Sequence, residues 1–385
     1  MLNSVAKVER WLEKHYVAPA FAGWLLLGFT AFFFLAAINT MAGWLYVISG
    51  GSLALLVVAG VLPERSLRGI QIQRAAIAPV SAGESLRLQL TIVNPTSAAK
   101  TLFQVEDLLP PSLGKPQQHV IEELPPQSSQ PWFYQIETWR RGVHAWETVQ
   151  LRTAAPLGLF WCRRTRKVRS RAIIYPQVLN LHRCPLVDQL GQNLQQTLAD
   201  PRQQTRLSTE GATRSLRPYR HGDPLRLVHW RSSARFGELR VRELEIFRGG
   251  QEVILGLDTL FNWRSDDFEQ AVIAAASLYF YARRQHPQIS LWTGMNGMVQ
   301  GELAVLETLA AVSFNQREQA PLPHRPLIWL TQNPETLPSL PPGSRWLLWP
   351  ELEKAGRVQD HPLTSGGIVL QPDRTLLENL QMSQR

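Results

Sequence analysis

The chain has 385 residues, of which 44% are hydrophobic and 18% charged, so it is long enough for two or three domains and too apolar for an intrinsically disordered protein. Its formal net charge of +9 favours a negatively charged partner, which includes anionic lipid, nucleic acid and acidic proteins. The two cysteines, Cys162 and Cys184, indicate neither a disulfide framework nor a zinc motif.

Two apolar runs, residues 18–38 and 41–62, contain no Asp, Glu, Lys or Arg. Each has about the roughly 20 residues that a helix needs to cross a bilayer. Only Asn39 and Thr40 separate them, so residues 18–62 are predicted to form a tight transmembrane hairpin. Two successive spans without a cleavage site disfavour a signal peptide. Two buried helices of a soluble protein are the other alternative, but such helices rarely need apolar residues on all faces.

The charges that flank the hairpin predict its orientation. The turn has no basic residue, whereas both outer flanks do: Lys7, Arg10, Lys14, Arg65, Arg68 and Arg74. The positive-inside bias therefore places both termini and all soluble domains on the cytoplasmic side of the inner membrane. Residues 1–17 are predicted to be an amphipathic segment on the cytoplasmic membrane surface, and the basic flanks could hold anionic headgroups. The lipid bilayer is thus the first expected partner.

Residues 69–175 change to short alternating runs, which are typical of strands. Strands are expected over residues 85–93, 101–105, 120–124, 132–138, 143–151 and 168–174. This spacing suggests an immunoglobulin-like β-sandwich, for which a spacer or scaffold role is favoured over adhesion or ligand binding. Residues 176–213 contain a polar, glutamine-rich stretch and are predicted to be a long, partly mobile connector.

The segment from Arg217 to Arg248 is the densest mixture of arginine, aromatic and turn residues. Asp223-Pro224 is typical of a helix start, and Gly237 of a helix end. The helix would have an apolar face made by Leu225, Val228 and Trp230. A strand is expected over residues 238–247, with a bulge near Glu243 where the apolar phase slips.

The arginines of this segment have two interpretations. They either bind an anion or pair with nearby carboxylates, and internal pairing is favoured because planar guanidinium groups suit ion-pair networks. The residues concerned are Arg217, Arg220, Arg226, Arg231, Arg235, Arg240 and Arg242, with Asp223, Glu238, Glu243 and Glu245 as carboxylates. His221 and His229 match no metal or catalytic spacing, and Ser232 and Ser233 are interpreted as capping residues.

Beyond Arg248, apolar strands alternate with helices, which predicts a parallel sheet covered on both faces. The expected strands are residues 252–257, 289–293, 327–330, 346–349 and 368–370; the expected helices are 268–284, 303–312 and 376–380. Ligands of such sheets bind beyond the carboxyl ends of the strands, where the loops from Asp258 and Thr331 would converge.

The run RPYRHGDPLRLVHWRSSARFGELRVRELE resembles the signature block of the bacterial domain-of-unknown-function family 58, approximately Y-x-x-G-D-x-x-R-x-I-x-W-x-x-S-A-R. The positions that fill this pattern are Tyr219, Gly222, Asp223, Arg226, Val228, Trp230, Ser233, Ala234 and Arg235. Arg141-Gly142 and the run APLGLF at 155–160 also resemble family elements, with Ala155 replacing the usual Asp. The resemblance implies two amino-terminal spans, a β-rich region and, in residues 214–385, the signature block with a von Willebrand factor A-like (Rossmann-type) α/β domain.

The resemblance also implies partners but no reaction. Family members resemble partners of MoxR-type AAA+ ATPases, so a chaperone-adaptor or assembly role is implied. In metal-binding von Willebrand A domains, the first strand ends in Asp-x-Ser-x-Ser and holds Mg²⁺ with help from later loops. Here Leu260 occupies a ligand position, and only Asp258, Asn262 and Thr331 offer oxygens, so a degenerate site without metal or other cofactor is expected.

No catalytic constellation is found: phosphate-binding glycine loops and a G-x-S-x-G elbow are missing from the sequence. The favoured function is therefore a membrane-anchored cytoplasmic interaction or assembly-adaptor protein, not an enzyme. The alternative is an enzyme of envelope or lipid metabolism at the cytoplasmic membrane face, with a deep pocket joining Asp258, His221 and the arginines. Nucleic-acid binding ranks last, because no aromatic stacking platform is evident.

Overall fold

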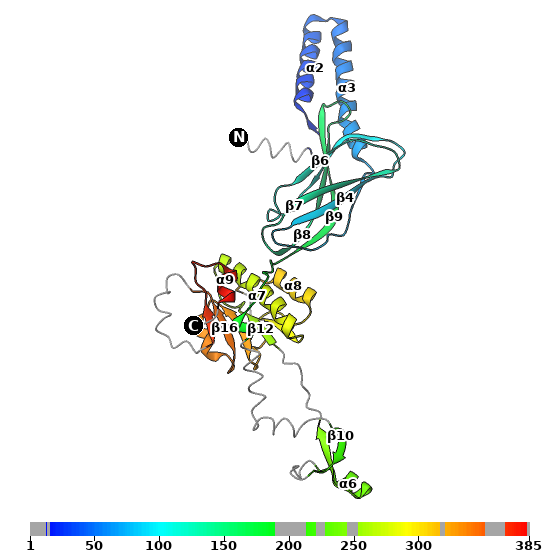
Figure 1. Ribbon diagram of the computed structural model, residues 1–385. Coiled ribbons are helices and arrows are strands. Elements are labelled where there is room, and N and C mark those ends of the chain that lie inside the picture. The colour runs from blue at the N-terminus through cyan, green and yellow to red at the C-terminus, as the bar shows by residue number, and fades with distance from the viewer. Residues whose placement is uncertain are drawn as a thin grey trace. The chain divides into compact units, whose positions relative to one another are not determined.

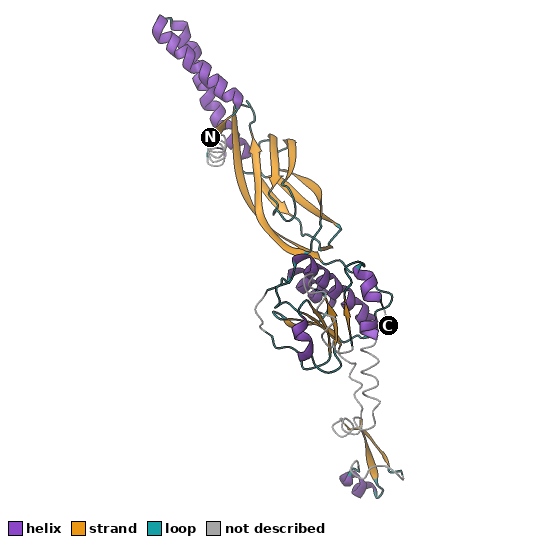
Figure 2. Ribbon diagram, turned by 90° about the vertical axis from the view of Figure 1, so that its left-hand side faces the viewer, coloured by secondary structure: helices purple, strands orange, loops and turns teal. Residues whose placement is uncertain are grey.

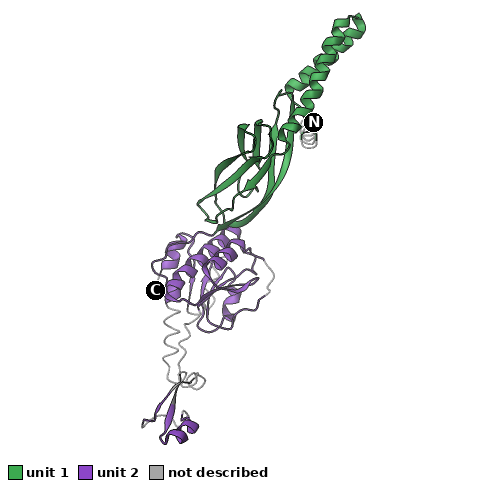
Figure 3. Ribbon diagram, turned by 90° about the vertical axis from the view of Figure 1, so that its right-hand side faces the viewer, with its two compact units in different colours: residues 1–175 green, residues 176–385 purple. Residues whose placement is uncertain are grey.

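The computed structural model describes residues 13, 16–188, 213–220, 228–244, 253–315, 320–350 and 366–382. The chain divides into two compact units, Met1–Tyr175 and Pro176–Arg385, shown in different colours in Figure 3. Each unit has its own buried core, and the two are described separately below.

The first unit begins with the predicted pair of apolar helices, α2 (Phe21–Thr40) and α3 (Gly43–Leu67), which run side by side in Figure 1. Both are long and apolar enough to cross a membrane, and only 17% and 22% of their most apolar windows is buried. The turn lies two residues later than predicted: Thr40 ends α2, and Met41 takes a left-handed conformation with φ of 54°. Hydroxyl groups inside the helices are satisfied locally, since Thr30 donates to the carbonyl of Leu26 at 2.8 Å.

Two β-sheets follow, shown as orange arrows in Figure 2. A three-stranded sheet has the order β2-β4-β7, and a larger sheet has the order β1-β9-β8-β5-β6, with β3 also on β9. All pairs are antiparallel except β3 with β9. The bounds are β1 (Ala18–Pro19), β2 (Gln71–Arg74), β3 (Val80–Ser81), β4 (Ser85–Asn94), β5 (Lys100–Asp107), β6 (Gln117–Leu124), β7 (Ser128–Glu137), β8 (Gly142–Thr153) and β9 (Phe160–Tyr175).

The two sheets pack face to face through alternate side chains of their strands. In β4, the residues at every second position are buried, as the alternating sequence predicts. Leu90 and Ile92 pack in one cluster with Phe103, Val105 and Leu151 of the larger sheet. The β-rich domain predicted for residues 69–175 is therefore present, and each of its six expected strands falls within or overlaps an observed strand.

The helix α3 continues directly into the core of this domain. Leu67, its last residue, is fully buried in the same cluster as Ile92 and Phe103. Three side-chain bonds fix the end of the helix: Lys100 Nζ donates to the carbonyl of Arg65 at 3.2 Å, and Arg166 donates to the carbonyls of Leu67 and Ile70 at 3.3 and 3.1 Å. These cations also suit the negative end of the helix dipole.

The second unit contains a six-stranded sheet with the order β14-β13-β12-β15-β16-β17. Every pair is parallel except the edge pair β13–β14. Its elements are β12 (Val253–Leu257), α7 (Ser265–Gln285), β13 (Ile289–Thr293), β14 (Gly297–Val299), α8 (Glu302–Ala311), β15 (Leu327–Thr331), the 3-10 helix η2 (Pro334–Ser339), β16 (Arg345–Leu348), β17 (Gly367–Val369) and α9 (Leu376–Gln381). The five predicted strands and three predicted helices of this region are all found, with shifted ends.

The two faces of this sheet are covered differently. On one face, α7, α8 and α9 bury Leu255, Leu291 and Leu330 in the largest cluster. On the other face, three tryptophans, Trp292, Trp329 and Trp346, pack with Leu337 of η2. The predicted sheet is thus covered on both faces, by α-helices on one and, among the described residues, by indoles and η2 on the other. The antiparallel edge strand β14 departs from the predicted parallel arrangement.

Part of the predicted connector belongs to the core of the second unit. Leu181, Cys184, Leu186 and Val187 are buried against α7. The amide of Leu179 donates to Ser277 Oγ at 2.9 Å, and Asp188 accepts from Tyr281 at 2.9 Å. Residues 176–188 are therefore packed rather than linking, because their leucines and valine outweigh the polar residues around them. The remainder of the predicted connector, residues 189–212, lies outside the described residues.

The signature segment forms a small group of strands and one helix, called the signature element below. It consists of the antiparallel strands β10 (Thr213–Pro218) and β11 (Arg240–Leu244) and the short helix α6 (Trp230–Phe236). These elements follow each other closely along the chain and are drawn around the label α6 in Figure 1.

Candidate interaction site

The helix α6 is fixed at both ends by its own sequence. His229 caps its start, since its Nδ1 accepts from the amide of Ser232 at 3.2 Å. Gly237 ends it in a left-handed conformation with φ of 71°, and its amide donates to the carbonyl of Ser233. The predicted helix end at Gly237 is therefore observed. The predicted start at Asp223 lies outside the described residues, as do Gly222 and Arg226.

Ser233 holds the helix against the neighbouring strand. Its hydroxyl donates to the carbonyl of His229 at 3.1 Å and accepts from the amide of Arg240 at 2.9 Å. The amide of Tyr219 donates to the carbonyl of Leu239 at 2.8 Å, which closes the hairpin from the other strand. The Ser233 hydroxyl thus has a structural role, and Ser233 is only 6% exposed.

The strand after the helix, β11, begins at Arg240, two residues later than predicted. The structure describes it as far as Leu244, and the rest of the predicted strand, residues 245–247, lies outside the described residues. An irregularity is present close to Glu243, but the extra residue lies in β10, between Thr213 and Ser215, opposite Leu244 and Glu243. The sequence showed the slip in phase but could not show which strand carries the additional residue.

The same element exposes large apolar side chains. Trp230 is 64% exposed, Phe236 55% and Leu239 42%. The predicted helix face that includes Val228 and Trp230 is therefore not formed: Val228 lies before α6, bridges to Val241 of β11 and is 5% exposed. Surface tryptophan and arginine on a small element are typical of protein-binding sites.

Charged groups surround these apolar residues. Arg240 pairs with Glu238 at 2.7 Å, and its guanidinium lies 4.1 Å from the centroid of the Phe236 ring. This is one of the predicted internal arginine–carboxylate pairs. Arg231 and Arg235 are exposed on α6. Arg240 therefore packs on Phe236, whereas Arg231 and Arg235 present positive charge to solvent.

The second group of predicted site residues lies at the carboxyl edge of the sheet in the second unit. Asp258 and Thr331 follow or end adjacent strands, and Thr331 Oγ1 donates to Asp258 Oδ2 at 2.6 Å. Asp258 Oδ1 accepts from the amide of Leu260 at 3.1 Å. Asp258 is 2% exposed and Thr331 is fully buried. The predicted convergence of these two loops is observed.

Asn262, the third predicted oxygen donor, is exposed and, among the described residues, forms no hydrogen bond with Asp258 or Thr331. The described residues contain no group of three or more His, Cys, Asp or Glu side chains that could hold a metal ion. A feature that the sequence analysis missed is Thr259: its fully buried hydroxyl has no hydrogen-bond partner among the described residues. Both carboxylate oxygens of Asp258 accept bonds from the protein, so the carboxylate orders its own loop.

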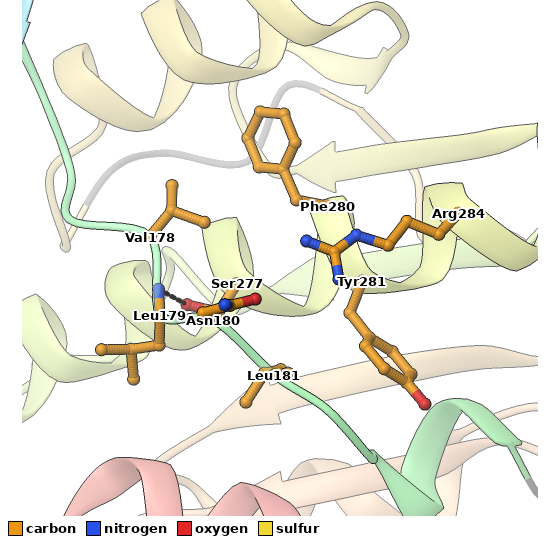
Figure 4. A pocket seen from close by; sticks show the side chains of 8 residues that line it. All are labelled: Val178, Leu179, Asn180, Leu181, Ser277, Phe280, Tyr281 and Arg284. Atoms are coloured by element: carbon orange, nitrogen blue, oxygen red, sulfur yellow. Dashed lines mark hydrogen bonds between the residues drawn. The ribbon is translucent and has the colours of Figure 1, made fainter.

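A pocket of about 300 Å³ lies elsewhere in the second unit, between residues 178–181 and α7 (Figure 4). Val178 and Phe280 give it an apolar wall, and Tyr281 and Arg284 give it polar groups. The phenol of Tyr281 donates to Asp188, and burial together with this bond raises the pKa of Tyr281. The sequence analysis did not find this pocket, since residues 176–188 were assigned to a connector.

A further cluster of charged groups is buried between the two sheets of the first unit. Asp107 accepts from Arg74 at 2.6 Å, from Trp146 Nε1 at 3.1 Å and from the Tyr134 hydroxyl. Burial and the charge of Asp107 raise the pKa of Tyr134. Arg74 and Tyr134 lie on the smaller sheet and Asp107 and Trp146 on the larger one, so these bonds join the two sheets, while Arg74 Nε has no hydrogen-bond partner among the described residues.

Comparison with known proteins gives one family. Residues 215–300 match the family described as "Protein of unknown function DUF58". No curated protein matches the chain. The match begins in β10 and includes the signature helix, β11 and the first strands of the second-unit sheet.

Solved structures show only distant similarity. The CARDB domain of a Pyrococcus furiosus protein is 7% identical, with a TM-score of 0.19, and the match covers 27% of this chain and 93% of that domain. A Listeria innocua β-glucosidase is 13% identical, with a TM-score of 0.18, over 29% of this chain and 16% of the enzyme. The Pseudomonas fluorescens alkylpurine DNA glycosylase AlkC is 14% identical, with a TM-score of 0.18, over 35% of this chain and 40% of that protein. Scores this low carry no argument about function. The matched residues 215–300 hold Tyr219, Trp230, Ser233 and Arg235 in the order of the signature, so the family match supports the resemblance of this segment to the DUF58 family.

Proposed function

We propose that this protein is a membrane-anchored cytoplasmic adaptor that binds a protein partner through its signature element, β10, α6 and β11. The observation that carries the proposal is the exposure of Trp230 and Phe236 on an element whose backbone is held by the bonds of His229 and Ser233. A large aromatic side chain that stays in water forgoes about 1.5–3 kcal/mol of burial, which a partner surface would supply. Arginine beside aromatic residues is the composition of interface hot spots.

The partner class comes from the family resemblance. Family members resemble partners of MoxR-type AAA+ ATPases, so an ATPase of this type is the proposed partner. The positive charge of Arg231 and Arg235 would favour an acidic surface on it. An adaptor is preferred to an enzyme because His229 and Ser233 are used in backbone bonds, and Asp258 orders its own loop. His221, which the enzyme alternative requires, lies outside the described residues.

Anchoring rests on α2 and α3, whose length and exposed apolar surface suit a bilayer. The basic residues that follow α3 favour a cytoplasmic position for the remainder of the chain. In this arrangement the sandwich, proposed to be immunoglobulin-like, acts as a spacer next to the membrane. Its buried network at Asp107 and its continuous bonds to α3 suit a rigid support.

The second unit is proposed to be von Willebrand factor A-like. The strand order, with an antiparallel edge strand, and the position of Asp258 and Thr331 at the carboxyl edge support this assignment. We propose that its site works without Mg²⁺, since Leu260 offers no oxygen and Asp258 accepts bonds from Thr331 and the loop amides.

The test is binding of the purified full chain, in detergent, to the MoxR-type ATPase of the same organism. Trp230→Ala with Phe236→Ala is expected to weaken binding by tenfold or more, since an aromatic hot spot contributes about 2 kcal/mol. Trp139→Ala is the matched control, because Trp139 is 80% exposed in the first unit and lies outside the signature element. Equal affinity of the double variant and the unmodified chain would show that the contact lies elsewhere, and no binding by the unmodified chain would remove this ATPase as the partner.

A further inference from the structure

A cavity of about 540 Å³ lies where α3 enters the first unit's sandwich. It is formed by the last turns of α3 and by the strand β9. Its lining consists of Val61, Glu64, Arg65, Leu67, Arg68, Arg164 and Arg166. Two features distinguish this cavity. Several arginine side chains line it, and it lies at the end of the apolar stretch of α3.

The charges of the lining do not cancel. Four arginines face a single carboxylate, Glu64, which pairs with Arg164 at 3.2 Å. Arg166 donates to the carbonyls of Leu67 and Ile70, which satisfies hydrogen bonds but leaves its charge uncompensated. Burial and the positive charge of Arg164 both lower the pKa of Arg166. Glu13, a second carboxylate among the described residues of this unit, is bound by Arg152 and Arg163.

Arg65 and Arg68 add two charges at the open side. Both are exposed, and neither pairs with a carboxylate among the described residues. They are not needed to hold the end of α3, since Lys100 and Arg166 already bond to its last carbonyls. The guanidinium groups are therefore available for an anionic ligand.

The position of the cavity identifies the ligand. The apolar stretch of α3 ends at Leu62, and the cavity begins with Val61 and continues through Arg68. A helix that crosses a bilayer places the residues at this boundary at the level of the lipid headgroups. Guanidinium groups bind phosphate oxygens in a bidentate fashion, and several hundred cubic ångströms exceed what one water molecule, about 30 Å³, requires.

We propose that this cavity binds the phosphate of an anionic phospholipid headgroup, with Arg65 and Arg68 as its entry and Arg164 and Arg166 as its floor. The inference rests on the membrane anchoring proposed above, and it adds a specific headgroup site to that anchor. Bound lipid would neutralise the cluster and fix the sandwich against the membrane surface.

The experiment is native mass spectrometry of the full chain in detergent, titrated with phosphatidylglycerol, phosphatidylcholine or inorganic phosphate. The unmodified chain is expected to retain phosphatidylglycerol in preference to phosphatidylcholine. Arg65→Gln with Arg68→Gln is expected to lower the affinity for phosphatidylglycerol about tenfold or more, from the usual contribution of a basic residue near anionic lipid. Arg169→Gln with Arg171→Gln removes the same charge from exposed positions of β9 outside the cavity and is expected to leave the affinity unchanged.

Arg65→Lys with Arg68→Lys keeps the charge and is expected to bind more tightly than the glutamine variant, which separates loss of charge from loss of fold. Equal retention of the two lipids, or an equal loss in the Arg169/Arg171 control, would overturn the proposal. Displacement of the lipid by inorganic phosphate at matched concentration would assign the site to a soluble phosphate and would also overturn it. Vesicle flotation of the same variants reports on anchoring itself: a chain that floats but shows no lipid preference refutes the headgroup site and not the anchor.

Discussion

Asp107 shows how a single residue can control the stability of the first unit. Its carboxylate is fully buried and binds Arg74, whose side chain is only 3% exposed. Asp107→Ala would leave a buried guanidinium without a counter-charge, and the expected loss is about 3–5 kcal/mol of unfolding free energy. Hydrogen–deuterium exchange of β5 and β7 in the full chain would measure this loss locally.

The neighbouring Glu106 provides the control for this prediction. It accepts from Gln118 at 2.9 Å at an exposed position of the same strand. Glu106→Ala is expected to change the stability by about 0.5 kcal/mol or less, as for most surface substitutions. Similar exchange rates in the two variants would mean that the Asp107 network contributes no more than a surface contact.

The environment of some candidate site residues could be predicted from the sequence, and that of others could not. Asp258 and Thr331 could be placed together because both occupy carboxyl ends of apolar strands, and the parallel sheet brings them within 2.6 Å. The exposure of Trp230 could not be predicted, since tryptophan is highly buried on average. Its position depends on where α6 begins, and His229 caps that start, a role that the sequence analysis did not assign to it.

At the scale of elements, the contact between α2 and the loop before β9 is the most specific. The carbonyl of Leu159 accepts from the amide of Ala20 at 2.8 Å, and a Cβ added to Gly23 would lie 2.2 Å from this oxygen. Gly23→Ala must therefore displace the loop or the helix, at a cost of about 1–3 kcal/mol. Thermal unfolding in one detergent would show the loss.

Gly28 lies in the same helix, and a Cβ there would meet nothing within 4 Å. Gly28→Ala is expected to be neutral or to stabilise the helix by up to about 1 kcal/mol. The two substitutions add the same methyl group to one helix. A loss of thermal stability in both variants would therefore mean that the effect comes from helix insertion and not from the Leu159 contact.

Elements with a long, regular pattern were predicted well from the sequence. The two apolar helices were predicted from the length of their uncharged runs, and β4 from its strict alternation of apolar and polar residues. Short elements were missed: β1 has two residues and owes its pairing to the register with Phe160 and Trp161. Residues 176–188 were misread for a similar reason, because their burial depends on α7, about a hundred residues later in the chain. Such long-range contacts leave no local pattern.

At the scale of the whole molecule, the central prediction is the side of the membrane on which the chain folds. The turn between α2 and α3 has no basic residue, while the arginine-rich cavity lies at the opposite end of α3. If both helices cross the bilayer, the turn must face outward and the sandwich must face the cytoplasm. A cysteine at Thr40 is therefore expected to react with a membrane-impermeant maleimide in intact spheroplasts, and a cysteine at Arg169 only after permeabilisation.

The two native cysteines are expected to contribute little background to this labelling measurement. Cys162 and Cys184 are fully buried, and burial raises the pKa of both, that of Cys184 to about 11. A thiol with a raised pKa is mostly protonated at neutral pH and reacts slowly, so little background labelling is expected. Labelling of the Arg169→Cys variant in intact spheroplasts would place the sandwich outside. In that case the cavity would face the outer leaflet, and a cytoplasmic ATPase could not reach the signature element.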